Sequence, residues 1–116
     1  MPRSKTQRED MTRYARMLSA IGTESRLRIL RLLLLAHPDG IVAGKIQEEL
    51  KISPSNLSHH LEKLKHEGVI SVTREHTFRR YRANTEALQE LLTFLYVECC
   101  RGSSVIRPES IVHMSR

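Results

Sequence analysis

The chain has 116 residues, enough for one domain, and 19 Lys and Arg against 13 Asp and Glu give it a formal net charge of +6. Apolar residues make up 40% of the sequence, which excludes a disordered chain, and 4% aromatics with no Trp argue against a stacking platform for single-stranded nucleic acid. The longest apolar run is too short to span a bilayer and nothing resembles a signal peptide, so we expect a basic, soluble, cytoplasmic protein.

Two helices are predicted before the first turn. Apolar residues that recur at helical spacing from Met11 onward predict a helix over about 7–20, which Gly22 ends. Thr23 is a suitable N-cap for a second helix, whose dense leucines leave almost no polar face. We therefore expect the second helix to lie at the centre of the fold, followed by a turn over 37–40.

Two shorter helices are expected next, with a tight connection between them. The first spans 43–50 and is expected to bury Ile46 and Leu50. Ser53 is a good N-cap for the second, and Pro54 occupies the first helical position, where its missing N–H costs nothing. A leucine stripe on this second helix is expected to face inward. The stripe consists of Leu57, Leu61 and Leu64, and Gly68 is expected to end the helix.

A β-hairpin is predicted after this helix pair. Apolar and polar residues alternate around Ile70 and Val72, and again around Tyr81 and Ala83. The residues between the two segments, 75–78, form the expected turn.

The last predicted helix lies near 86–100, with Asn84 or Thr85 as its cap. It has apolar residues on more than one face, and the first helix has a similar surplus at Met17. Because one side of a small core cannot hide so much apolar surface, we expect a homodimer through the first and last helices. The apolar residues of the last helix are Leu88, Leu91, Leu92, Phe94, Leu95, Tyr96 and Val97.

Two short helices across a three-residue turn, followed by a basic hairpin, are typical of a winged helix-turn-helix. We therefore predict a mainly α fold with a small β-hairpin. Polar residues in the N-terminal half of the second of these helices are candidates for DNA contact, because that part of such a helix reaches base edges in the major groove. The candidates are Ser53, Ser55, Asn56, Ser58 and His59. The alternative is that they are ordinary helix-surface residues.

The hairpin is strongly basic, with Arg74, Arg79, Arg80 and Arg82 in nine positions. Arg79, Arg80 and Arg82 are expected to bind phosphates or enter the minor groove, and the alternative is a solvated basic strand. His60 lies on the flank of the leucine stripe, where a structural hydrogen bond is favoured over contact with a base or a ligand.

Three segments of the chain are similar to one known family. Together they resemble the recognition helix, the second-helix entry and the wing of the ArsR/SmtB metalloregulatory repressors. The resemblance implies a homodimeric bacterial repressor, not an enzyme, that binds double-stranded palindromic operator DNA and dissociates when an effector binds. The segments are 53–61 with 65–70, 23–30 and 79–82, and the resemblance covers 11–100. We expect 1–101 to form the winged helix-turn-helix DNA-binding and dimerisation domain, and 102–116 to form a flexible tail.

The effector sites of this family are matched only in part. Its Cys-x-Cys sensor in the third helix corresponds to Val42 and Gly44 here, and its zinc site on the last helix has no counterpart. Cys99 and Cys100 remain, at the end of the last helix, where a subgroup of the family's arsenic sensors also carries adjacent cysteines. Thiolates prefer soft centres such as trivalent arsenic and antimony.

We therefore expect a trivalent arsenic or antimony species as the inducer, bound by Cys99 and Cys100, and no tightly bound cofactor. Valence favours methylarsenite over arsenite, because methylarsenite leaves two positions for thiolates and the chain has two cysteines. Three alternatives stay open: a thiol redox sensor, an effector-independent winged-helix DNA-binding protein, and a role of the cysteines as small apolar residues near a dimer interface. A thiol reductase is disfavoured, because it would need a low-pKa cysteine at a helix N-terminus.

Overall fold

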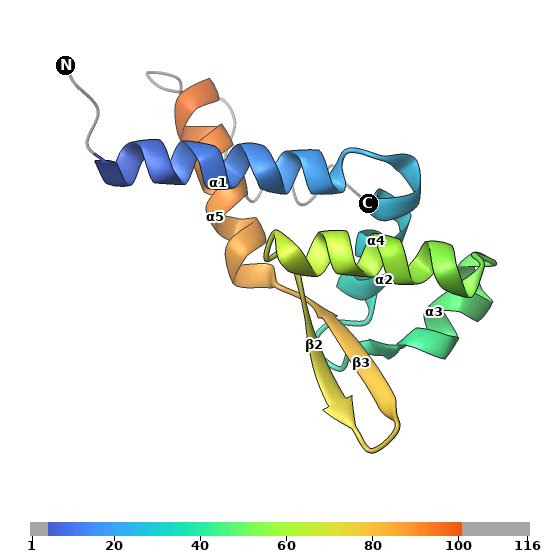
Figure 1. Cartoon of the computed structure of the whole chain (residues 1–116). Coiled ribbons are helices and arrows are strands. Elements are labelled where there is room, and N and C mark those ends of the chain that lie inside the picture. The colour runs from blue at the N-terminus through green and yellow to red at the C-terminus, as the bar shows by residue number, and fades with distance from the viewer. Residues whose placement is uncertain (1–4, 101–116) are drawn as a thin grey trace. The chain divides into compact units, whose positions relative to one another are not determined.

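Helices dominate the fold, together with one small sheet (Figure 1). The computed structural model describes residues 5–100, with side chains from residue 9 onward. The chain divides into two compact units at the junction between Thr85 and Glu86. Within the described residues, no helix is both long and apolar enough to cross a membrane. The elements in chain order are α1 (Lys5–Ile21), α2 (Glu24–Leu35), β1 (Ile41–Val42), α3 (Ala43–Leu50), α4 (Pro54–His66), β2 (Ile70–Glu75), β3 (Phe78–Ala83) and α5 (Thr85–Cys99).

The helix boundaries follow the local signals in the sequence. Thr23 caps α2 and Ser53 caps α4, each side chain accepting a hydrogen bond from the backbone N–H three residues ahead, at 3.2 and 3.3 Å. Pro54 is the first residue of α4, as predicted. Gly68 follows α4 with a φ of 75°, the left-handed conformation that ends many helices. The two short helices predicted across a three-residue turn, α3 and α4, are therefore confirmed.

The sheet has three antiparallel strands in the order β1-β3-β2. The predicted hairpin is confirmed, with Ile70 opposite Ala83, and it projects away from the helices of the first unit (Figure 1). Strand β1 was not predicted from the sequence, because a strand of two residues is too short to show alternation. Ile41 pairs with Tyr81 on β3 and so ties the connection between α2 and α3 to the hairpin.

The core of the first unit lies where α2 packs against α1, α3, α4 and β3. The leucine stripe of α4 faces this core, as predicted, with all three leucines at most 3% exposed. Burial of this stripe holds α4 in place and turns its polar face toward solvent. The largest fully buried side chains are Met17, Ile29, Leu33, Ile46, Leu64 and Val69.

Several apolar residues lie elsewhere than predicted. Leu50 is half-buried and not part of the core. Met17 is only 1% exposed, so the apolar surplus of α1 consists of Met11 and Leu18 instead. Although α2 is central, part of its surface remains open, because its neighbours do not surround it. The exposed leucines of α2 are Leu27, Leu34 and Leu35.

The second unit contains nearly all of α5, which ends at Cys99. Leu92, Leu95 and Val97 are 57%, 41% and 49% exposed, so α5 carries the apolar surplus that the sequence predicts. The predicted tail, 102–116, lies outside the described residues.

Candidate DNA interface and thiol pair

The N-terminal half of α4 presents an exposed polar face. Its side chains offer hydroxyl, amide and imidazole groups that can donate to or accept from base edges and phosphates. The cap occupies the side-chain oxygen of Ser53 as an acceptor, which leaves its hydroxyl proton free to donate. All five predicted contact residues are exposed, namely Ser53, Ser55, Asn56, Ser58 and His59.

His60 lies half-buried at the edge of this face. Its Nδ1 atom is buried and has no hydrogen-bond partner within the described residues, so the predicted structural hydrogen bond is absent at that nitrogen. Burial, then the positive charge of Arg26 and the neighbouring His59, lowers the pKa of His60 below its ordinary 6.5. This shift favours the neutral form of the ring.

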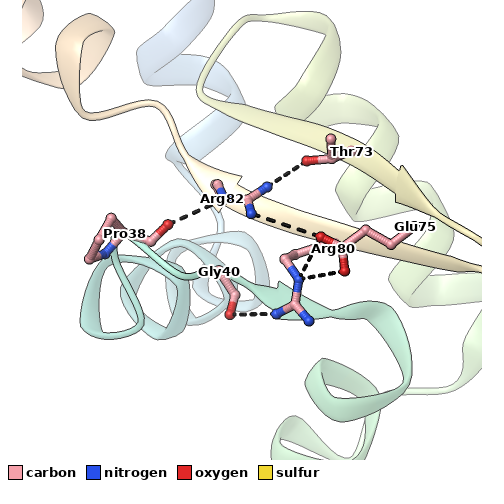
Figure 2. A network of polar contacts seen from close by, with 6 residues as sticks. All are labelled: Pro38, Gly40, Thr73, Glu75, Arg80 and Arg82. Carbon is pink, nitrogen blue, oxygen red and sulfur yellow. Dashed lines mark hydrogen bonds and ion pairs between the residues drawn. The ribbon is translucent and has the colours of Figure 1, made fainter.

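The face of the hairpin that bears Arg80 and Arg82 carries a network of polar contacts (Figure 2). The Nε atom of Arg80 donates to both carboxylate oxygens of Glu75, at 3.0 and 3.1 Å. Its Nη1 atom donates to the backbone carbonyl of Gly40 at 3.3 Å. Arg80 thus joins the hairpin to the turn that precedes β1.

Arg82 extends the same network (Figure 2). Its Nε atom donates to the Pro38 carbonyl at 3.2 Å, and its Nη1 atom donates to the hydroxyl of Thr73. Its Nη2 atom also lies 4.0 Å from Oε2 of Glu75. Two of the three arginines predicted to bind phosphate therefore have partners within the protein.

The opposite face of the hairpin carries Arg74 and Arg79, which face each other directly in the register of β2 and β3. Both are exposed. Because directly opposed residues on neighbouring strands project to the same side, the two arginine side chains leave the sheet from neighbouring positions on one face. Like charges in that position repel each other, and a bound phosphate would relieve the repulsion. Arg74 belongs to the basic cluster of the sequence but was not among the predicted site residues.

The two cysteines lie at the described end of α5. Cys99 is exposed and Cys100 is half-buried, and both are free thiols. The backbone N–H of Cys100 donates to the Tyr96 carbonyl at 2.8 Å, so the helical path continues to this residue. Burial, then the hydrogen bond and charge of the Cys99 thiol, raises the pKa of Cys100 above its ordinary 9.0. Across the described residues, no group of three or more His, Cys, Asp or Glu side chains is placed to hold a metal ion.

Comparison with known proteins places these features in one family. A helix-turn-helix domain family matches residues 21–73. The transcriptional repressor SdpR of Bacillus subtilis is 37% identical over 79 residues, 68% of this chain and 84% of the relative. The chain belongs to the ArsR family of winged-helix transcriptional regulators. It is therefore a DNA-binding regulator and not an enzyme.

Two solved structures of this ArsR-family fold are similar in architecture. An ArsR-like transcriptional regulator from Rhodococcus sp. RHA1 has a TM-score of 0.67 at 23% identity, over 75% of this chain and 79% of the other. The homodimeric winged helix-turn-helix DNA-binding domain of a possible ArsR-family regulator from Mycobacterium bovis has a TM-score of 0.65 at 24% identity, over 85% and 89%. At these identities the likeness shows the fold alone.

The ArsR-family fold brings some of the predicted site residues together and separates others. The five polar residues lie together at the N-cap and in the first half of α4, whereas the wing arginines divide between two faces of the hairpin. Glu75, which holds Arg80, was not selected because it was assigned to the hairpin turn, and its contact with Arg80 depends on the register in which β2 and β3 pair. Successive residues of β3 project to opposite faces of the hairpin. This alternation is the one signal in the sequence that places Arg79 on a different face from Arg80 and Arg82.

Proposed function

We propose that this ArsR-family protein is a homodimeric repressor that releases its operator DNA when a trivalent arsenic or antimony species binds Cys99 and Cys100. The observation that carries the proposal is the pair of adjacent free thiols at the end of α5, one exposed and one half-buried. Two thiols side by side form a donor set for a soft, thiophilic centre.

DNA recognition in this proposal uses α4 and the wing. The exposed polar face of α4 enters the major groove, where Ser55, Asn56 and His59 reach base edges. Arg74 and Arg79 bind phosphates beside the groove, because both are exposed and no described hydrogen bond or ion pair occupies them. Of the three arginines predicted from the sequence to bind phosphate, Arg79 keeps that role in this proposal, and Arg74 takes it in place of Arg80 and Arg82.

Dimerisation is supported by the exposed apolar residues of α5 and by the homodimeric relative from Mycobacterium bovis. Apolar surface of this extent on a small protein is usually covered by a partner. A two-fold dimer would place two recognition helices on half-sites about 34–36 Å apart, one turn of the DNA helix.

The chemistry of the thiol pair favours a centre with two exchangeable groups. Methylarsenite carries two hydroxyl groups and one methyl group on trivalent arsenic. Two thiols replace the two hydroxyl groups, so two S–As bonds form, two As–O bonds break and two water molecules leave with the thiol protons. The raised pKa of Cys100 therefore does not obstruct the exchange, because its proton departs in water. Arsenite would keep a third hydroxyl group, and the chain has no third cysteine.

The test is a release experiment on DNA. A fluorescent duplex carrying the sequence that the protein selects from a random library is bound by the protein in a reduced buffer without competing thiols. The complex is then titrated with methylarsenite, arsenite, antimonite, zinc and peroxide. We expect release by the trivalent arsenicals and antimonite, with methylarsenite effective at the lowest concentration, and no release by zinc.

Each other outcome contradicts a defined part of the proposal. Release by peroxide alone would assign the cysteines to redox sensing. Sequence-specific binding that no compound reverses would indicate an effector-independent DNA-binding protein. Equal midpoints for methylarsenite and arsenite would contradict the valence argument.

A further inference from the structure

One carboxylate lies among the arginines of the wing. Glu75 is the last residue of β2, and its two oxygens accept from Arg80 at 3.0 and 3.1 Å, with Arg82 at 4.0 Å. It is also the one acidic residue of the hairpin between Ile70 and Ala83. Glu75 thus engages two of the four cationic groups with which the wing could attract DNA (Figure 2).

This network remains open to exchange. The side chains of Arg80, Arg82 and Glu75 are 30%, 34% and 42% exposed, so a phosphate can reach the arginines. A phosphate that took Arg80 from Glu75 would replace one ion pair by another and leave a carboxylate close to the DNA backbone. Because the gain and the loss nearly cancel, these two arginines contribute little to binding a generic duplex.

We propose that Glu75 limits the affinity of the wing for non-specific DNA by occupying Arg80 and Arg82, so that only Arg74 and Arg79 bind phosphate freely. Glu75 is a positioning residue that acts through the two arginines, and no contact between Glu75 and DNA is required. Low non-specific affinity matters to a repressor, because random genomic sites compete with its operator. The inference rests on DNA binding through the wing, which is part of the proposed function.

The discriminating measurement is the salt dependence of binding to a duplex of random sequence. The slope of log K against log salt changes by about 0.9 for each phosphate that the protein neutralises. Glu75→Gln keeps the length of the side chain and an oxygen that accepts from Arg80, but it removes the charge. We expect a slope steeper by about 0.9 to 1.8, because one or both arginines become free to neutralise a phosphate. Between 200 and 50 mM salt this corresponds to an additional increase in affinity of about 3-fold to 12-fold.

Two controls separate this effect from a general change in charge. Glu24→Gln removes one negative charge from a comparable pair on α2, where Glu24 lies 2.8 Å from Arg28, and it should leave the slope unchanged. In a protein that already carries Arg80→Gln and Arg82→Gln, adding Glu75→Gln should also leave the slope unchanged. Thermal unfolding of every variant verifies that it is folded.

Each possible result either supports or contradicts the role proposed for Glu75, or contradicts the proposed function. The proposal is supported if Glu75→Gln makes the slope steeper in the otherwise unmodified protein and leaves it unchanged in the protein that lacks Arg80 and Arg82. An unchanged or shallower slope in a folded Glu75→Gln protein would show that Glu75 only stabilises the hairpin, and the same steepening in Glu24→Gln would show a general charge effect. Either result overturns the proposal. Failure of the unmodified protein to bind any duplex would instead contradict the proposed function.

Discussion

Two glycines of the first unit share one backbone conformation but differ in their surroundings. Gly40, in the turn before β1, has a φ of 78°, and Gly68, after α4, has a φ of 75°. A Cβ atom on Gly40 would lie 2.6 Å from the carbonyl oxygen of Tyr81 and 2.6 Å from the Cγ atom of Arg82. A Cβ atom on Gly68 would meet nothing within 4 Å. The substitutions Gly40→Ala and Gly68→Ala therefore share the conformational cost, and only the first adds a steric one.

The expected magnitudes follow from these two terms. A left-handed residue with a side chain costs about 1–2 kcal/mol relative to glycine, so Gly68→Ala should lower the free energy of unfolding by about that amount. Gly40→Ala must also move a backbone oxygen of β3, and overpacking of this kind costs roughly 1–3 kcal/mol more. Since Arg80 donates to the Gly40 carbonyl, the same displacement would disturb the wing.

Urea unfolding followed by circular dichroism, at one fixed protein concentration, measures both variants against the unmodified chain. We expect Gly40→Ala to lose about twice as much stability as Gly68→Ala or more, and to bind DNA more weakly. Equal losses for the two variants would refute the close approach of β1 to β3 at Gly40.

Four further predictions concern the recognition helix, the cysteines and the dimer. Ser53→Ala should lower the free energy of unfolding by about 1 kcal/mol, measured by urea titration, because α4 loses its N-cap. The lowered pKa of His60 means that the unfolded chain takes up the proton first as the pH falls below 6.5, so stability should decrease there. In His60→Gln, the free energy of unfolding should fall less between about pH 7 and pH 5. Iodoacetamide should modify Cys99 before Cys100, as followed by peptide mass spectrometry, because Cys100 is less exposed and its pKa is raised. Light scattering at micromolar concentration should give the mass of a dimer, and a stable monomer would contradict the proposed interface.

Local signals in the sequence predicted much of the fold. Thr23 and Ser53 cap their helices, and Gly68 ends α4, because each of these roles depends on a few neighbouring residues. The alternation of the hairpin and the leucine stripe of α4 have short periods that the sequence displays directly. The exposed polar face of α4, which carries four of the predicted site residues, followed from the same periodicity.

Pairings between distant residues could not be predicted in this way. Arg80 meets the carbonyl of Gly40 and Arg82 meets that of Pro38, across about forty positions that only the folded chain brings together. The same limit applies to β1, which exists because β3 supplies its partner. Exposure of individual leucines on α2 also depends on how far neighbouring helices extend, and the periodicity of the sequence carries no such information.

The central claim is that the thiol pair couples a trivalent arsenical to release of DNA. The most direct measurement compares release of the selected duplex by methylarsenite from the unmodified protein, from Cys99→Ser and from Cys100→Ser. We expect all three proteins to bind the duplex with similar affinity, because the thiols lie at the end of α5 and not on α4 or the wing. Only the unmodified protein should release the duplex. Release from both serine variants at the same methylarsenite concentration would contradict the claim.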